Sequence, residues 1–156
     1  MSADLLIRNV RPMAGAAVDV LATAGVIARV GPGIAAAPGA EVVDGQHGIL
    51  LPGFVDAHMH LESVKLMVDE FARLVLPLGT TAVVADPHEI ANVLGSDGVH
   101  WLLDASEHLQ LEVYFMAPSC VPASPFESPR RALTPGDLEA LMRRSRVLGL
   151  AEMMNF

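Results

Sequence analysis

The sequence predicts an α/β protein in which a parallel sheet follows a small β-subdomain, because its two regions show different patterns. Residues 1–51 contain four short β-like runs, at 4–10, 17–22, 26–30 and 41–43, with turn residues such as Pro38-Gly39 between them. Residues 52–156 alternate strand-like and helix-like runs. Strands in series joined by helices are typical of a parallel sheet with right-handed crossovers, so we expect a β-subdomain segment and then an α/β domain.

The first two strands of the second region have clear signals. The strand at 54–60 follows the Pro52-Gly53 break, and the strand at 81–85 is apolar after its first residue, as expected where both faces of a sheet are covered. A helix is predicted between them because five apolar residues share one helical face. These residues are Met67, Phe71, Leu74, Val75 and Leu78.

The remaining elements follow in the same alternation. A helix is expected at 97–108, a strand at 111–117 and a last strand at 147–151. Another helix is expected to begin at Thr134, which can cap it, with Pro135 suited to its first turn. Chemistry in parallel sheets gathers at the carboxyl ends of the strands, whether the sheet closes into a barrel or stays open.

Composition and charge limit the possible partners. The 156 residues are 52% hydrophobic, and 18 acidic against 10 basic residues give a formal net charge of −8. This charge argues against nucleic acid or an anionic membrane as a partner. Five arginines form one basic cluster, which we expect to be a solvated surface. They are Arg130, Arg131, Arg143, Arg144 and Arg146.

The single cysteine and the N-terminus predict a cytoplasmic location. Cys120 has no partner for an intrachain disulfide, which fits a reducing compartment. Residues 1–8 lack a basic stretch followed by an apolar core, and no apolar segment is long enough to span a bilayer.

The strongest functional signal is Asp56-Ala57-His58-Met59-His60 at the end of the first strand. Alternate side chains of a strand share a face, so His58 and His60 are about 7 Å apart along the backbone and could bind one metal ion. Other polar residues also follow strand ends. They are Glu62, Asp86, His88, Glu89, Ser119, Cys120 and Glu152.

Glu152 is the most informative of these residues. It shares strand parity with Leu148 and Leu150, so if those residues face the inside of a barrel, Glu152 points inward at its mouth. A carboxylate in that place is costly unless a cation meets it. We therefore expect Glu152 to share a cation with the two histidines.

Structural readings of the same residues remain open. Asp86-Pro87-His88-Glu89 is also a good start for a helix, and Glu62 is also suited to the first turn of one. Pro118-Ser119-Cys120-Val121-Pro122 is also typical of a rigid loop, in which Cys120 is a small buried residue rather than a nucleophile.

Several strings resemble one known family. Residues 52–60 are similar to the first-strand signature of the amidohydrolase superfamily, whose members join a metal-bearing (β/α)8 barrel to a small β-sandwich. Within it, the strings at 84–95 (VADPHEIANVLG) and 149–156 (GLAEMMNF) are similar to the adenine deaminases. The resemblance is weak before residue 48 and strong after it.

This resemblance implies a function and a set of residue roles. It implies hydrolytic deamination of adenine to hypoxanthine and ammonia by a binuclear centre of divalent metal, Mn²⁺ or Fe²⁺, with Zn²⁺ possible. It makes His58, His60 and Glu152 metal ligands, with Glu152 bridging the metals. Glu62, Asp86, His88 and Glu89 become candidates for orienting the ligands or contacting the substrate.

The length departs from the family pattern. A barrel of this kind takes about 250 residues, so residues 52–156 correspond to its first four β units, an N-terminal half. We expect this chain alone to be inactive, and the complete protein to be a homo-oligomer or to pair with a complementary C-terminal half. Two alternatives are an amidohydrolase acting on a cyclic amide and a non-catalytic half-barrel that recruits another chain.

Overall fold

The computed structural model describes residues 4–13 and 15–155 and divides the chain into two compact units, Met1–Pro52 and Gly53–Phe156. Residues 1–3, which we considered for a leader, and Phe156 of the 149–156 string lie outside the described part. Each unit has its own sheet.

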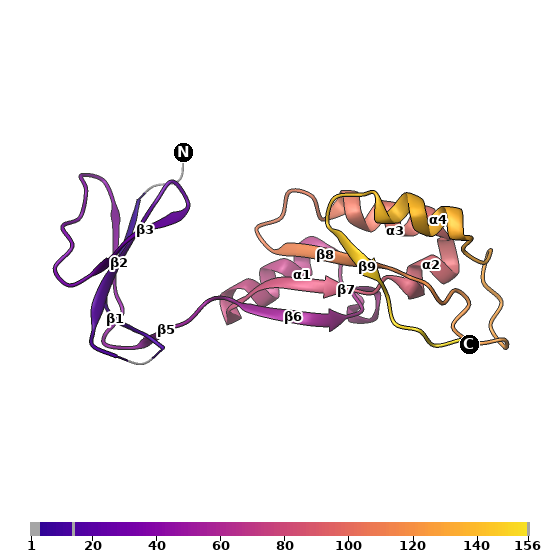
Figure 1. Cartoon of the computed structure of the whole chain (residues 1–156), viewed down its shortest axis with the longest axis horizontal. Coiled ribbons are helices and arrows are strands. Elements are labelled where there is room, and N and C mark those ends of the chain that lie inside the picture. The colour runs from indigo at the N-terminus through magenta and orange to yellow at the C-terminus, as the bar shows by residue number, and fades with distance from the viewer. Residues whose placement is uncertain (1–3, 14, 156) are drawn as a thin grey trace. The chain divides into compact units, whose positions relative to one another are not determined.

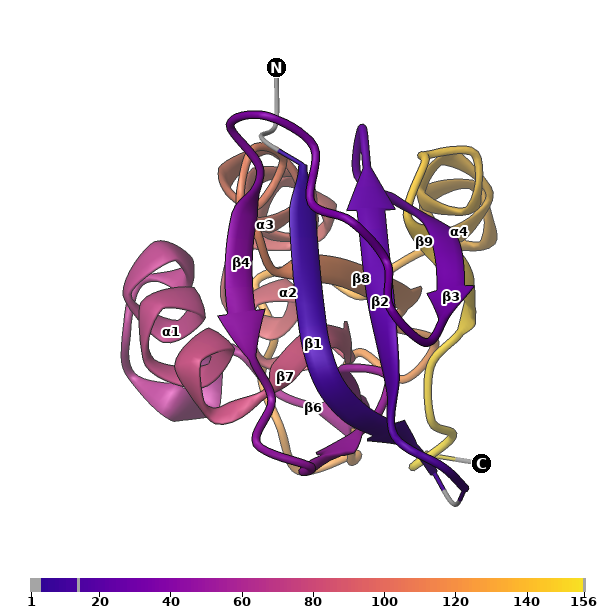
Figure 2. The same ribbon diagram turned by 90° about the vertical axis from the view of Figure 1, so that its left-hand side faces the viewer.

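The first unit is a mixed five-stranded sheet with the order β3-β2-β1-β4 (Figure 2). β1 pairs antiparallel with β2 and parallel with β4 and β5. Asp19 on β2 is buried and accepts hydrogen bonds from the backbone N–H groups of Asn9 (3.2 Å) and Ile34 (3.0 Å), which ties the loop after β3 to the sheet. The strands are β1 (Leu5–Pro12), β2 (Val18–Thr23), β3 (Val26–Gly31), β4 (Glu41–Asp44) and β5 (Ile49–Leu50).

The second unit is a four-stranded sheet in which every neighbouring pair is parallel, with the order β6-β7-β8-β9 (Figure 1). This confirms the predicted α/β class. The strands are β6 (Phe54–Met59), β7 (Thr80–Ala85), β8 (Glu112–Ala117) and β9 (Val147–Leu150). The helices are α1 (Val68–Val75), α2 (His88–Leu94), α3 (Ser96–Ala105) and α4 (Pro135–Met142), with 3-10 turns at Glu62–Val64 and Leu76–Leu78.

The core of this unit lies between one face of the sheet and the helices. Val83, Phe115, Leu103 and Leu141 are fully buried there. The expectation that strand 81–85 is covered on both faces is wrong for this chain. Ala82 and Val84 are only half-buried, because the helices pack against the other face, which carries Val83 and Ala85.

The helices differ from the predictions at their ends. The DPHE string does begin a helix, α2, which Gly95 ends before α3 starts, so the single helix expected at 97–108 is the second of two and ends at Ala105. None of the helices in the described ranges is long and apolar enough to cross a membrane.

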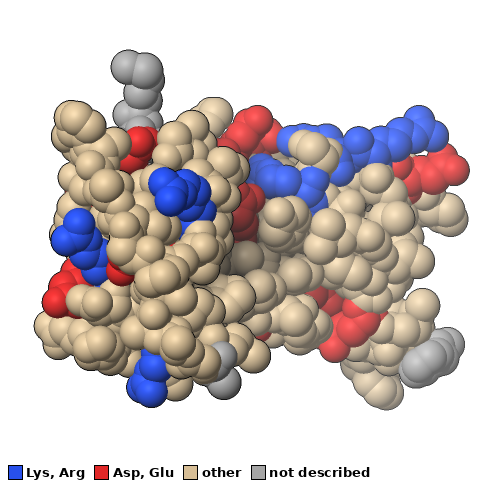
Figure 3. Space-filling view, turned by 60° about the vertical axis from the view of Figure 1, so that its left-hand side comes forward, with Lys and Arg blue, Asp and Glu red and all other residues tan. Residues whose placement is uncertain are grey.

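The arginine cluster is exposed at Arg130, Arg131 and Arg143, as expected of a solvated surface, and half-buried at Arg144 and Arg146. Arg131 donates to Ser96 and Asp137, and Arg144 pairs with Asp104 and contacts His100. Arg146 donates to the backbone carbonyls of Leu103 and Val113, so it joins α3 to β8. On the face shown in Figure 3, basic side chains lie beside acidic ones on a mostly uncharged surface.

The contacts at the N-terminus of α4 should make part of the free energy of unfolding depend on pH. Hydrogen bonds from the Arg131 guanidinium and from Thr134 hold the pKa of Asp137 well below its ordinary value. A carboxyl with a lowered folded-state pKa stabilises the fold above its unfolded pKa of about 3.9 and loses that contribution as the pH falls. We expect Asp137→Asn to lower the free energy of unfolding in urea at pH 7, with a smaller difference from wild type at pH 3. An equal difference at both values contradicts this.

Candidate metal centre

The end of β6 presents two histidines side by side. The rings of His58 and His60 are 5.1 Å apart between centroids and nearly perpendicular, and their side chains are 51% and 25% exposed. The Nδ1 atom of His60 lies 2.9 Å from the backbone carbonyl oxygen of Asp86, so this nitrogen carries the proton. The Nε2 atom of His60 is therefore left with a free lone pair, which is the form that binds a metal.

The end of β7 presents Asp86 and His88. The backbone N–H of Asp86 donates to the carbonyl of Met59 at 2.9 Å, which sets Asp86 beside the histidines of β6. The Asp86 side chain is 1% exposed, and neither carboxylate oxygen has a hydrogen-bond partner among residues 4–13 and 15–155. The Nδ1 atom of His88 lies 3.4 Å from Asp86 Oδ1 without hydrogen-bond geometry, and its ring centroid lies 4.6 Å from that of His60.

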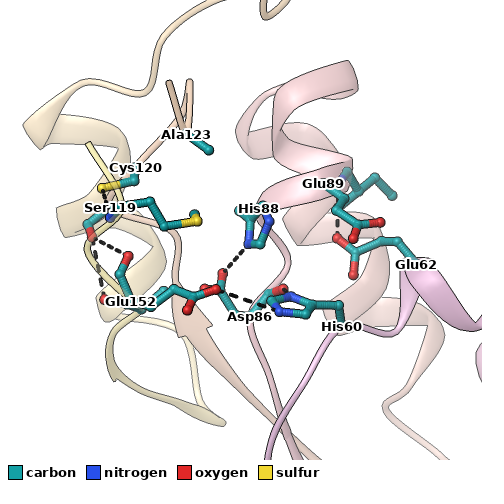
Figure 4. A network of polar contacts seen from close by, with 12 residues as sticks. His60, Glu62, Asp86, His88, Glu89, Ser119, Cys120, Ala123 and Glu152 are labelled. Carbon is teal, nitrogen blue, oxygen red and sulfur yellow. Dashed lines mark hydrogen bonds and ion pairs between the residues drawn. The ribbon is translucent and has the colours of Figure 1, made fainter. Parts of the chain in front are cut away.

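Glu152 approaches the same point from beyond the end of β9. Its Oε1 atom lies 3.6 Å from His60 Nε2 and 3.8 Å from His58 Nε2. Figure 4 shows Glu152 directed toward Asp86, His60 and His88, which come from the other strand ends.

Strand alternation with Leu148 and Leu150, from which we expected Glu152 to point inward, does not explain the position of Glu152. The pairing of β8 with β9 shifts between Phe115 and Met116, so Leu150 pairs with the buried Ala117 and lies beside α4. Leu150 therefore faces the helices, not the opposite side of the sheet. Glu152 reaches the histidines because the chain has left the strand after Leu150.

These residues fit a metal ion. Single ligand atoms of His60, Asp86, His88 and Glu152 all lie within 4.8 Å of one another. Two atoms bound to one ion at about 2.1 Å are about 3.0–3.6 Å apart, which matches the 3.6 Å from His60 to Glu152 and the 3.4 Å from His88 to Asp86. A buried carboxylate without hydrogen bonds is costly, and a cation removes that cost. Imidazole and carboxylate are together a suitable donor set for a divalent transition metal.

Further polar residues lie beside this cluster, and Figure 4 shows two of them, Glu62 and Glu89. Glu62 accepts a hydrogen bond from the N–H of Ile90 at 2.9 Å through Oε1, while its Oε2 atom is buried without a partner. Burial raises the pKa of Glu62, and the Ile90 hydrogen bond opposes this. Ser63 donates to Glu89. Both contacts tie the turn after β6 to the first turn of α2, which carries His88.

The predicted site residues therefore fall into two groups. His60 and Glu152, expected as ligands, lie in the cluster with Asp86 and His88, which we had placed among the orienting or substrate-contacting candidates. His58 lies at its exposed side, and Glu62 and Glu89 lie around it.

Sequence reasoning missed a pocket beside His88. It has a volume of about 200 Å³ and is lined partly by Asn92, whose Oδ1 atom is buried without a partner, and by Cys120. Asn92 lies one helical turn after His88, and this spacing on α2 was the available signal.

Comparison with curated proteins gives long matches at high identity. The adenine deaminase of Archaeoglobus fulgidus is 48% identical over 138 residues, which are 88% of this chain and 24% of that protein. The adenine deaminase of Halalkalibacterium halodurans is 42% identical over 99% of this chain and 27% of its own length. The chain thus spans about a quarter of the length of these relatives.

Solved structures share the fold. The N-isopropylammelide isopropylaminohydrolase of Burkholderia multivorans is 28% identical, with a TM-score of 0.60 over 90% of this chain and 42% of that one. A dihydroorotase reaches a TM-score of 0.67 at 17% identity, over 96% of this chain and 42% of that one, which shows the fold alone.

The sequence profile of the Amidohydrolase family matches residues 49–154, which are more than half of the chain and include every residue of the cluster. The resemblance found in the sequence is therefore confirmed, and the chain belongs to the amidohydrolase family of metal-dependent hydrolases.

Proposed function

We propose that a protein of the relatives' full length that contains this chain hydrolyses adenine to hypoxanthine and ammonia. The observation that carries the proposal is the buried Asp86 carboxylate, which lacks hydrogen-bond partners at the centre of a cluster of two histidines and a glutamate. The adenine deaminases that the chain resembles at 42–53% identity support adenine as the substrate.

The cluster would hold divalent metal, for which we propose a pair of Mn²⁺ or Fe²⁺ ions, with Zn²⁺ as a third candidate. Such metal, when bound, lowers the pKa of a water so that hydroxide is available near neutral pH to attack the carbon bearing the amino group.

The residues of this chain would bind and orient that centre. His60 Nε2 has its lone pair free because Nδ1 is bound to the Asp86 carbonyl. Glu152 lies within 4 Å of both β6 histidines, which suits a bridging carboxylate, and we assign His58 as a ligand on its exposed side. Asp86 and His88 would complete the donor set from the β7 end.

Glu62 and Glu89 would orient this centre from outside or contact the substrate. Both link the turn after β6 to α2, and so fix the direction of His88. A neutral purine needs no basic surface, which is compatible with a net charge of −8.

The proposed activity depends on more than these 156 residues. The relatives are about four times as long, and this chain alone presents its cluster at the end of an open four-stranded sheet. We therefore propose that the chain alone turns over little or no adenine. Assembly as a homo-oligomer or with a complementary C-terminal half stays a prediction.

Removing one charge should weaken metal binding without unfolding the chain. We expect Asp86→Asn and Glu152→Gln each to weaken Mn²⁺ binding by at least tenfold in calorimetric titrations, because each removes an anionic ligand. Metal-free Asp86→Asn should be at least as stable as wild type, since it no longer buries an unpaired carboxylate. Glu139→Gln on the exposed side of α4 is the matched control and should bind as wild type does. Equal affinity in all four proteins contradicts the site.

A chimaera tests the substrate. Residues 4–155 would replace the matching segment of the Archaeoglobus fulgidus adenine deaminase, to which the chain is 48% identical. We expect ammonia release from adenine by the chimaera and a loss of at least about 100-fold in kcat on Glu152→Gln. The 156-residue chain alone should release almost none. A folded chimaera that opens a hydantoin or dihydropyrimidine but leaves adenine intact would favour the cyclic-amide alternative.

A further inference from the structure

The segment that carries Glu152 is held by the loop after β8. We propose that Ser119 and Cys120 are positioning residues that set the place of Glu152 in the metal centre. This inference rests on the proposed function, in which Glu152 is a ligand.

Cys120 receives two backbone hydrogen bonds from this segment. Its Sγ atom accepts from the N–H of Met154 at 3.0 Å and from the N–H of Asn155 at 3.4 Å. The thiol also contacts the Met153 sulfur at 3.3 Å. The contacts join residues more than 30 positions apart, so they fix one loop against another (Figure 4).

Neighbouring contacts act on the same segment. The hydroxyl of Ser119 lies 3.5 Å from the backbone carbonyl oxygens of both Ala151 and Glu152. The side-chain amide of Asn155 donates to the backbone carbonyl of Pro122 at 3.4 Å. Residues 151–155 are therefore held on both sides of Glu152 by residues 119–122.

The sheet does not hold Glu152 directly. β9 ends at Leu150, and the last backbone hydrogen bond along β8 joins the N–H of Ala151 to the carbonyl of Ala117 at 2.9 Å. The parity of β9 is broken by the register shift described above. Strand geometry thus leaves the direction of the Glu152 side chain open, and the contacts beyond the strand determine it.

The thiol is well placed for this role. Cys120 is 4% exposed, so water has little access to its sulfur, while Met154 is half-buried and Asn155 is exposed. Sulfur is a weak acceptor, but without it the N–H groups of Met154 and Asn155 would lose the contact that joins them to the loop after β8 and would be left to water. Valine at position 120 would keep most of the volume and remove the acceptor, whereas serine would keep an acceptor with a shorter reach.

The first test needs no metal. Backbone amide hydrogen exchange would be measured by NMR on the metal-free 156-residue chain. We expect exchange at Met154 and Asn155 to become at least tenfold faster in Cys120→Val. In Cys120→Ser it should stay within about threefold of wild type. Val121→Ala is the matched control, because it removes buried volume from the same loop and makes none of these hydrogen bonds.

The second test asks whether the loop acts through Glu152. Cobalt(II) would be titrated into each variant and followed by its visible absorption. Cys120→Val should weaken Co²⁺ binding about tenfold, the effect usual for residues that orient metal ligands, and Cys120→Ser should largely restore it. In a Glu152→Gln background, Cys120→Val should have no further effect, because the ligand that it positions is gone.

The outcomes separate this inference from the proposed function. Unchanged exchange at Met154 and Asn155 in Cys120→Val overturns the inference, as does an equal loss of Co²⁺ affinity with and without Glu152. A wild-type chain that binds no Co²⁺ counts against the metal centre itself, and the exchange rates then decide whether the loop holds the segment.

Discussion

The site depends on one constraint, which is the burial of the Asp86 carboxylate without a hydrogen-bond partner in the described part of the chain. Two hydrogen bonds fix the backbone of Asp86, which directly follows β7. Its N–H donates to the carbonyl of Met59, and its carbonyl accepts from Nδ1 of His60. An ionised carboxylate in such a place is stable only if positive charge meets it. The histidines and Glu152 surround that point, so the arrangement makes sense as a metal centre and would be a defect without one.

The parallel sheet explains why residues so far apart in sequence meet. Every crossover returns the chain in the same direction, so the carboxyl ends of β6, β7, β8 and β9 lie at one edge. Helix packing buries one face of the two central strands, β7 and β8, whereas β6 and β9 contribute only partly buried residues to the core. The side chains at the edge are then free to vary in chemistry without a large effect on the fold.

Much of this was predictable, because the signals are local. Strand alternation predicted that His58 and His60 lie side by side, and they do, although β6 also has a register irregularity between Asp56 and Met59. The order of strands and helices follows from apolar spacing. The position of Asp86 within the cluster was harder to predict, since a carboxylate before Pro87 is also typical of a helix start, and α2 does start there. The partners of Arg144 and Arg146 could not be predicted, because they lie about 40 residues away and depend on how α3 and β8 pack.

Glu152 lies close to the histidines, as expected, but not for the expected reason. Its proximity to the histidines was expected from parity with Leu148 and Leu150, yet the register shift turns Leu150 toward α4. A register shift of one residue turns every later side chain of a strand to the opposite face, so the alternation before the shift does not predict the faces after it. Since the strand no longer sets the direction, non-local contacts must do so, and the ones present come from Ser119 and Cys120. Of the four clustered residues, Glu152 is thus the one whose position depends most on loop packing and least on the sheet.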